Sequence, residues 1–190
     1  MKAVKALVGG GVYLSPLGLD DVERVMVFMN DEDVRVLARS RRDALNEATT
    51  KDMIERIQKQ DEGFMICRND DDRKIGYALI MDQDRYNREA SIALVIGERD
   101  QRGKGFGGEA LRLLLKHGFV NLNLESMYLG VYEYNTAAIG LYEKTGFKPV
   151  GRRRNAKIFG NRKYDEVIMD MISDEYFARY GNAEMDAYGI

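Results

Sequence analysis

Four glycines fall within the six residues from Gly103 to Gly108, and this run restricts the possible folds of the chain more than any other feature. A strand-like apolar segment ends near Ile96, and an apolar pattern with helical spacing begins near Phe106. The glycines therefore lie between a strand and a helix, where the first amide N–H groups of the helix point outward. These amides and the helix dipole attract anions, and glycine has no Cβ to hold a ligand away. The run predicts an α/β fold with a phosphate or pyrophosphate site at this loop.

Two common phosphate-binding motifs fit the loop poorly. The P-loop pattern fails because Lys104 is followed by Gly105 rather than by Ser or Thr. Gly103, Gly105 and Gly108 match G-x-G-x-x-G literally, but that motif normally opens a first βαβ unit, and here an antiparallel meander is expected before it. A glycine-rich turn without a ligand stays open as an alternative, so the loop alone does not identify what binds.

Hydrophobic periodicity predicts one α/β (α+β) domain over residues 12–172. Helical spacing is expected after Asp20, from Asp31 to Arg39 and from Thr50 to Gln60. Strand-like runs are residues 12–17, 63–68, 74–82, 89–96, 127–131, 148–158 and 163–172, and further helices are expected over 106–121 and 135–144. Residues 1–11 are expected to form a flexible entry, and residues 173–190 form a C-terminal extension, either a helix or a loose end.

Composition excludes several kinds of chemistry. The chain of 190 residues has one Cys and one His, which rules out an internal disulfide, a Cys-rich metal site and a multi-histidine zinc site. No metal is therefore expected. The net charge of −2 offers no global attraction for nucleic acid, and the basic run Arg152–Arg154 is interpreted as a solvated strand face. No segment has 18 consecutive apolar residues and no signal peptide is recognised, so no membrane partner is expected and a cytoplasmic location is predicted.

A second motif follows the glycine loop, running from Asn135 to Phe147 as NTAAIGLYEKTGF. Together with Arg102, Gly105 and Gly107, which satisfy R/Q-x-x-G-x-G/A, it resembles the GNAT superfamily of acyl-CoA-dependent N-acyltransferases. The resemblance covers about residues 12–172. Segments 12–17 and 29–31 are similar to ribosomal-protein N-terminal acetyltransferases, although Phe28 stands where that branch often has Trp. Segments 87–90 and 160–165 are similar to spermidine and nucleotide-sugar acetyltransferases.

The resemblance implies a mixed, mostly antiparallel sheet of six or seven strands, flanked by helices on both faces. The fourth and fifth of these strands are expected to splay into a V that receives the pantetheine arm of acetyl-CoA. The backbones of Val95, Ile96 and Gly97 would face that arm and the thioester. The expected pyrophosphate ligands are the backbone amides of Arg102, Gly103, Lys104, Gly105, Phe106 and Gly107. Asn135 has two interpretations that can both hold, an N-cap of its helix and a cofactor ligand.

Tyr142 is the predicted catalytic residue. Its spacing alone favours a core position three residues after Ile139, but the resemblance assigns its phenol to protonating the departing thiolate. Glu89 and Glu133 are candidates for the general base, although a solvated surface carboxylate is the favoured interpretation of each. In some ribosomal-protein acetyltransferases a glutamate stands where this chain has Gly130, so the resemblance supplies no base.

The predicted reaction is direct acetyl transfer from acetyl-CoA to an amine in a ternary complex. A protein N-terminal amine ranks first as the acceptor, and a polyamine or amino-sugar ranks second. The alternative is a non-catalytic module of the same fold that senses acyl-CoA or binds RNA or protein. Homodimers are common in the superfamily, so a homodimer is a further expectation.

Overall fold

The computed structural model describes residues 4–38 and 44–188, with side chains in the last helix described up to Gly181. Within these ranges the chain forms eight strands and six α-helices. The strands are β1 (Leu7–Val8), β2 (Val12–Pro16), β3 (Glu62–Arg68), β4 (Lys74–Asp84), β5 (Glu89–Ile96), β6 (Ser126–Tyr132), β7 (Lys148–Phe159) and β8 (Arg162–Ile172). The helices are α1 (Val22–Asn30), α2 (Glu32–Leu37), α3 (Glu47–Gln60), α4 (Phe106–Lys116), α5 (Thr136–Thr145) and α6 (Ser173–Tyr188). A π-helical turn, His117–Asn121, extends α4.

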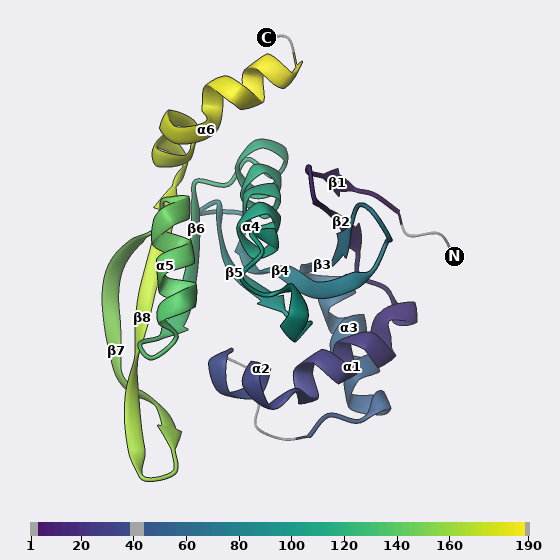
Figure 1. The fold of residues 1–190 in the computed structure, drawn as a ribbon. Coiled ribbons are helices and arrows are strands. Elements are labelled where there is room, and N and C mark those ends of the chain that lie inside the picture. The colour runs from purple at the N-terminus through teal and green to yellow at the C-terminus, as the bar shows by residue number, and fades with distance from the viewer. Residues whose placement is uncertain (1–3, 39–43, 189–190) are drawn as a thin grey trace.

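The strands join into one sheet in the order β1-β2-β3-β4-β5-β6-β8-β7 (Figure 1). All neighbours are antiparallel except β5 and β6, which run parallel because α4 connects them. The predicted α/β sheet is confirmed, and its expected six or seven strands become eight in the described residues, partly because β1 adds an edge strand.

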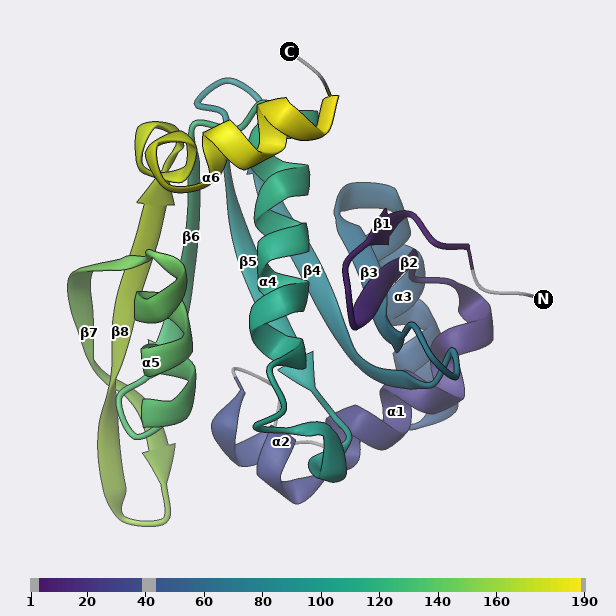
Figure 2. The same cartoon turned by 45° about the horizontal axis from the view of Figure 1, so that its top comes forward.

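Helices cover both faces of the sheet, each through an apolar stripe at helical spacing. On one face α4 buries Ala110, Leu111, Leu114 and Leu115 against the centre of the sheet, with α5 beside it (Figure 2). On the other face α1 and α3 bury their apolar side chains against β2, β3 and β4. Two separate hydrophobic cores result, with the central strands between them.

The parallel pair β5–β6 separates along its length. Pairing begins at Glu89 with Ser126 and ends at Ser91 with Tyr128, although both strands continue beyond this point. Figure 2 shows the two ribbons diverging toward the end of the sheet where α4 begins. The expected V-shaped splay is therefore present, and it leaves the second half of β5 without a neighbour on its β6 side.

Both ends of the described chain pack on this framework. Leu7 and Val8 pair with Leu14 and Tyr13, so a short strand lies within the range expected as a flexible entry. In the C-terminal extension, α6 buries Tyr176 against the core that contains α4 and α5. The division of the chain near residues 11 and 172 remains a prediction.

Candidate functional site

The open half of β5 carries apolar residues that the sheet does not fully cover. Ala90, Ser91 and Ile92 are buried, whereas the next four residues, up to Ile96, are only half-buried, and the change comes where β6 departs. A neighbouring strand would normally enclose four strand residues of this kind. The predicted ligands Val95 and Ile96 lie here, and Gly97 follows directly. This edge of β5 can therefore receive an extended ligand with both polar and apolar groups.

The glycine loop opens α4 in the way that the sequence predicts. Gly105 is the N-cap residue with φ 90°, Gly103 has φ 75°, and no side chain caps this end of the helix. These two left-handed conformations require glycine. Glu109 N–H makes the first backbone bond back along the chain, to Gly105 O at 3.1 Å, so the amides of Phe106, Gly107 and Gly108 precede the helical ladder.

The loop has room for a ligand, and it adjoins both β5 and α5. A Cβ built on Gly103 or Gly105 would meet nothing within 4 Å. A Cβ on Gly107 would lie 3.6 Å from Ile96 Cγ1 on β5 and 3.6 Å from Leu141 Cδ2 on α5. An anion held by the loop would thus lie between the open half of β5 and the helix that carries Tyr142.

Arg102 uses its side chain inside the protein. Its guanidinium donates to the carbonyl oxygens of Ile96 (2.9 Å) and Gly97 (3.0 Å). It also contacts Asp33 at 2.9 Å and Asp31 at 3.4 Å, at the start of α2. Partial desolvation opposes ionisation of Asp31, but hydrogen bonds from Val34 N–H and Arg102 outweigh it and lower the pKa of this carboxyl. Arg102 can therefore offer its backbone amide to a ligand while its side chain fixes α2 to the loop.

The N-terminus of α5 is closed by its own side chain. Asn135 Oδ1 accepts a hydrogen bond from Ala138 N–H at 3.2 Å, and Asn135 Nδ2 donates to Leu37 O of α2 at 3.1 Å. The predicted N-cap is confirmed, and the amide also holds the end of α2. The second predicted role of Asn135, as a cofactor ligand, remains a prediction.

Tyr142 lies on the buried face of α5 and is 8% exposed. Its ring packs edge-on against Phe147, which follows the helix-ending Gly146. Burial raises the pKa of its phenol to about 12, so the hydroxyl is protonated at neutral pH. Leu141, its neighbour, packs against Gly107 and Gly108. Tyr142 is thus a buried proton donor on a helix that touches the glycine loop.

The two carboxylates considered from the sequence as bases occupy structural positions. Glu133 accepts a hydrogen bond from Asp165 N–H at 2.9 Å and pairs with Arg152 at 3.0 Å. Glu89 lies at the start of β5, in the part that is still paired with β6. A third carboxylate, Glu166 of β8, was missed from the sequence and lies over Gly130. A glycine inside a strand signals a close approach, but it does not identify the group that approaches.

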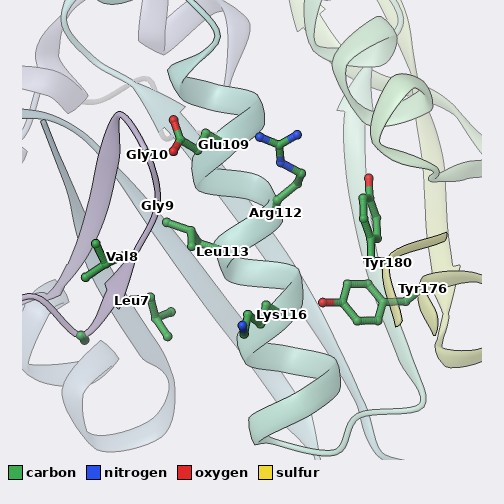
Figure 3. Close-up of a pocket in the computed structure, with 11 residues that line it drawn as sticks. Leu7, Val8, Gly9, Gly10, Glu109, Arg112, Leu113, Lys116, Tyr176 and Tyr180 are labelled. Carbon is green, nitrogen blue, oxygen red and sulfur yellow. The ribbon is translucent and has the colours of Figure 1, made fainter. Parts of the chain in front are cut away.

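Two hollows lie near α4 and α1. The first, about 460 Å³, is lined by Gly9, Gly10, Glu109, Arg112, Tyr176 and Tyr180, among others, and lies between β1, α4 and α6 (Figure 3). It contains none of the predicted site residues. The second, about 490 Å³, is lined by Phe28, Asp31 and Gly97 together with their neighbours, beside the open end of β5. Only the second adjoins the candidate site.

Comparison with known proteins identifies the family. The family model for the acetyltransferase (GNAT) domain matches residues 12–148. The chain therefore belongs to the GNAT acetyltransferases, and it is an acetyl-CoA-dependent N-acetyltransferase.

Individual relatives agree with this assignment. An uncharacterized, SPbeta prophage-derived N-acetyltransferase of Bacillus subtilis is 28% identical over 131 residues, 69% of this chain and 73% of the relative. The spermidine N(1)-acetyltransferase of Escherichia coli is 32% identical over 111 residues, 58% of this chain and 59% of the relative. The fold matches that of the Vibrio cholerae spermidine N-acetyltransferase solved with CoA and spermine, with a TM-score of 0.82, 20% identity, and coverage of 89% of this chain and 99% of that one.

The site fits acetyl-CoA as the acetyl donor. A pyrophosphate needs unpaired amides with open space beside them. No side chain caps the start of α4, and a Cβ built on Gly103 or Gly105 would meet nothing within 4 Å. A pantetheine arm needs an open strand edge, which β5 offers beyond Ser91. Within the described residues, no group of three His, Cys, Asp or Glu could hold a metal ion. In the same ranges, no helix has the length and apolar composition needed to cross a membrane.

Proposed function

We propose that this enzyme acetylates a primary amine of a small polyamine, by direct transfer from acetyl-CoA in a ternary complex. The observation that carries the proposal is the composition of one face of β6 and β8, beside the splay. Strand registers align Ser91, Tyr128 and Asp170 across β5, β6 and β8, and they align Tyr132 with Glu166. These residues lie on the face opposite α4 and α5, because Met127, Leu129 and Val131 alternate with them and pack toward those helices.

That face combines carboxylates and aromatic rings, the two groups that bind ammonium ions best. Tyr128, Ile168 and Asp170 are half-buried, so a ligand can reach them. Burial and the nearby carboxylate of Glu175 raise the pKa of Asp170, which a bound ammonium would offset. An aromatic face adds cation–π attraction. A chain with several ammonium groups and flexible methylene linkers fits such a surface.

The predicted site residues receive the following roles in this proposal. The backbones of Val95, Ile96 and Gly97 orient the pantetheine arm and the thioester carbonyl along β5. The amides of Arg102, Gly103, Lys104, Gly105, Phe106 and Gly107 hold the pyrophosphate. Tyr142 donates its phenolic proton to the sulfur as the thiolate leaves, since a phenol with a pKa of about 12 stays protonated until that step. Asn135 holds α5, and hence Tyr142, in place.

The comparisons support a polyamine over a protein N-terminus as the acceptor. The relatives that are named for an acceptor are spermidine acetyltransferases, whereas none supports the protein N-terminal amine that the sequence analysis ranked first. A spermidine N-acetyltransferase of Vibrio cholerae forms a dodecamer. We therefore also propose a homo-oligomer, of which the expected homodimer is the simplest form, and a cytoplasmic location.

The test is the release of CoA with a panel of amines. We expect kcat/KM for spermidine to exceed that for an N-terminal peptide and for an amino-sugar by about tenfold or more, since a hydrogen bond to a charged group contributes about 1.5–3 kcal/mol. Preference for the peptide would contradict the polyamine assignment. Binding of acetyl-CoA without turnover on any amine would favour the non-catalytic module instead.

A matched pair of variants tests the face itself. Asp170→Asn should raise KM for spermidine about tenfold and leave kcat nearly unchanged, because it removes a binding charge remote from the thioester. Asp174→Asn removes the same charge from the exposed first turn of α6 and should leave both constants unchanged. Equal effects of the two substitutions would show that only the overall charge matters.

A further inference from the structure

The carboxylate of Glu166 lies over a glycine of the neighbouring strand. Glu166 is 1% exposed, although it belongs to the outer part of the sheet on β8. A Cβ built on Gly130 of β6 would lie 2.8 Å from Glu166 Cδ and 3.2 Å from Glu166 Cγ. Every other residue type at position 130 would therefore displace the carboxylate. Because Gly130 has no Cβ, the Glu166 side chain can occupy this space.

This position is at the wall of the splay. Pairing between β5 and β6 ends at Tyr128, so Gly130 lies two residues into the open part of β6. Gly130 is half-buried, which leaves the strand edge accessible beside the carboxylate. Glu166 lies on the face proposed to bind the acceptor, whereas Tyr142 lies on the opposite side, among the core residues of α4 and α5. The two groups therefore approach the open edge from opposite faces of the sheet.

The surroundings of Glu166 are cationic and aromatic. On β7, Arg153 Nε lies 3.4 Å from Glu166 Oε2. On β6, Tyr132 is directly opposite Glu166, and Lys157 Nζ of β7 lies 4.7 Å from the centre of the Tyr132 ring. Positive groups thus lie on the β7 side of Glu166, and Gly130, in the open part of β6, lies on its other side.

We infer that Glu166 is the group that takes the proton from the acceptor amine before attack, an inference that rests on the proposed function. A general base must come within hydrogen-bond reach of the ammonium or within one water of it, and it must lie on the side from which the amine enters. Glu166 lies on the face from which the amine enters, which meets the second condition. The open edge of β6 at Gly130 brings the amine, or a water between them, within reach and meets the first. Glu89 does not meet these conditions, because it lies where the strands are still paired. Glu133 does not meet them, because it lies beyond Tyr132, the last residue of β6, where it accepts a hydrogen bond from Asp165 N–H.

The proton balance of the reaction closes with these two residues. The acceptor R–NH3+ gives one proton to Glu166, and the free amine attacks the thioester carbon, so that a C–N bond forms. Collapse breaks the C–S bond, and the leaving thiolate takes the phenolic proton of Tyr142. The nitrogen then loses a second proton, which restores Tyr142, and Glu166 releases its own proton to water. The products are the N-acetyl amine, CoA and one proton.

The first test replaces the charge and keeps the shape. Glu166→Gln should lower kcat/KM for spermidine at pH 7 by about 100-fold, within the usual contribution of a general base, while affinity for CoA is unchanged. The residual rate should rise about tenfold per pH unit toward the pKa of the amine, because only amine already deprotonated in solution can react. Wild-type kcat/KM at pH 7 in Glu166→Gln would overturn the inference.

The second test moves the carboxylate from one strand to the other. Glu166→Ala should be as impaired as Glu166→Gln, and adding Gly130→Asp to it should restore at least about tenfold of kcat/KM, because a side chain at 130 starts beside the vacated position. Gly130→Asn in the Glu166→Ala background is the matched control and should restore nothing. Equal rescue by Asp and Asn would assign a packing role to Glu166 and overturn the inference. A wild-type protein that acetylates no amine would instead overturn the proposed function, and this inference with it.

Discussion

The two helices beside the splay begin in opposite ways. At α4, Gly105 adopts a left-handed conformation, no side chain caps the helix, and a Cβ built on Gly105 would meet nothing within 4 Å. At α5, Asn135 caps the helix with its own side chain and holds Leu37 of α2 with the other end of the amide. Both helices follow a strand that borders the V, so the difference is local. The helix proposed to bind the pyrophosphate has an uncapped start, and the helix that carries Tyr142, the proposed proton donor, has a capped one.

The difference also separates two kinds of recognition. The proposed donor site uses backbone amides, which glycine at certain positions exposes. The proposed acceptor face consists of side chains of β6 and β8 that strand pairing brings together. Substitutions at the two helix starts should therefore change different measurable quantities.

The largest effect on activity is expected from a substitution in α5, the helix whose N-terminus Asn135 caps. Tyr142→Phe should lower kcat by about 100-fold or more and leave the Kd for CoA unchanged, because it removes only the proton donor. In the wild type, no loss of activity from ionisation of Tyr142 is expected until the pH approaches its pKa of about 12. Tyr13→Phe, which removes a hydroxyl bonded to Asp72 at 3.0 Å on the other side of the molecule, is the control and should keep full turnover. An unchanged rate in Tyr142→Phe would contradict the assignment.

A substitution at the uncapped start of α4 should change the affinity for CoA rather than kcat. Gly105→Ala forces a Cβ onto a residue with φ 90° and should weaken CoA binding by about tenfold, at a cost of about 1–2 kcal/mol in the free energy of unfolding. Isothermal titration measures the first effect and thermal unfolding the second. Gly140→Ala in α5 is the matched control, since its Cβ would meet nothing within 4 Å and should stabilise the helix by about 0.5–1 kcal/mol. Equal loss of CoA binding in both variants would contradict a specific role of the start of α4 in binding CoA.

The side chain of Arg102 connects the two regions. Arg102→Ala should lower the free energy of unfolding by about 1–2 kcal/mol at pH 7, because two backbone carbonyls and the carboxylates of α2 lose a charged donor. The folded protein lowers the pKa of Asp31, so the stability from this carboxyl is present above its ordinary pKa near 3.8 and is lost as the pH falls through the lowered value. Denaturant titrations should show the difference between the wild type and Arg102→Ala narrowing below that pH, to the part contributed by the two backbone carbonyls. A constant difference in free energy down to pH 2 would argue against the ion pairs.

The smallest effect is expected at the cap of α5. Asn135→Ala should cost about 1 kcal/mol of stability, as removal of a good N-cap usually does, with a modest fall in kcat as α5 loosens. Asn135→Asp keeps the cap acceptor and should retain most of the stability. A loss of CoA affinity in both variants, larger than the change in stability, would support the second predicted role of Asn135 as a cofactor ligand.

The sequence predicted local conformations around the proposed donor site, because each depends on a few neighbouring residues. The glycine turn at 103–108 and the cap at Asn135 are two of these, and the structure confirms both conformations. Strand 89–96 was predicted with its observed bounds, since its apolar run ends at a glycine. The contact of His117 with Glu62, at 2.6 Å, could not be predicted in this way, because the π-helical turn and β3 meet only in the folded chain.

Only the tertiary structure decided what lies around Gly130. In the sequence, Glu166 stands 36 positions from Gly130 among many other acidic residues, and nothing nearby indicates burial. Antiparallel pairing of β6 with β8 places the two on the same face, and the missing Cβ lets the carboxylate settle there. Backbone recognition follows from local sequence because glycine acts on its own dihedral angles. A pair formed across strands depends on register, which is set by the packing of the whole sheet.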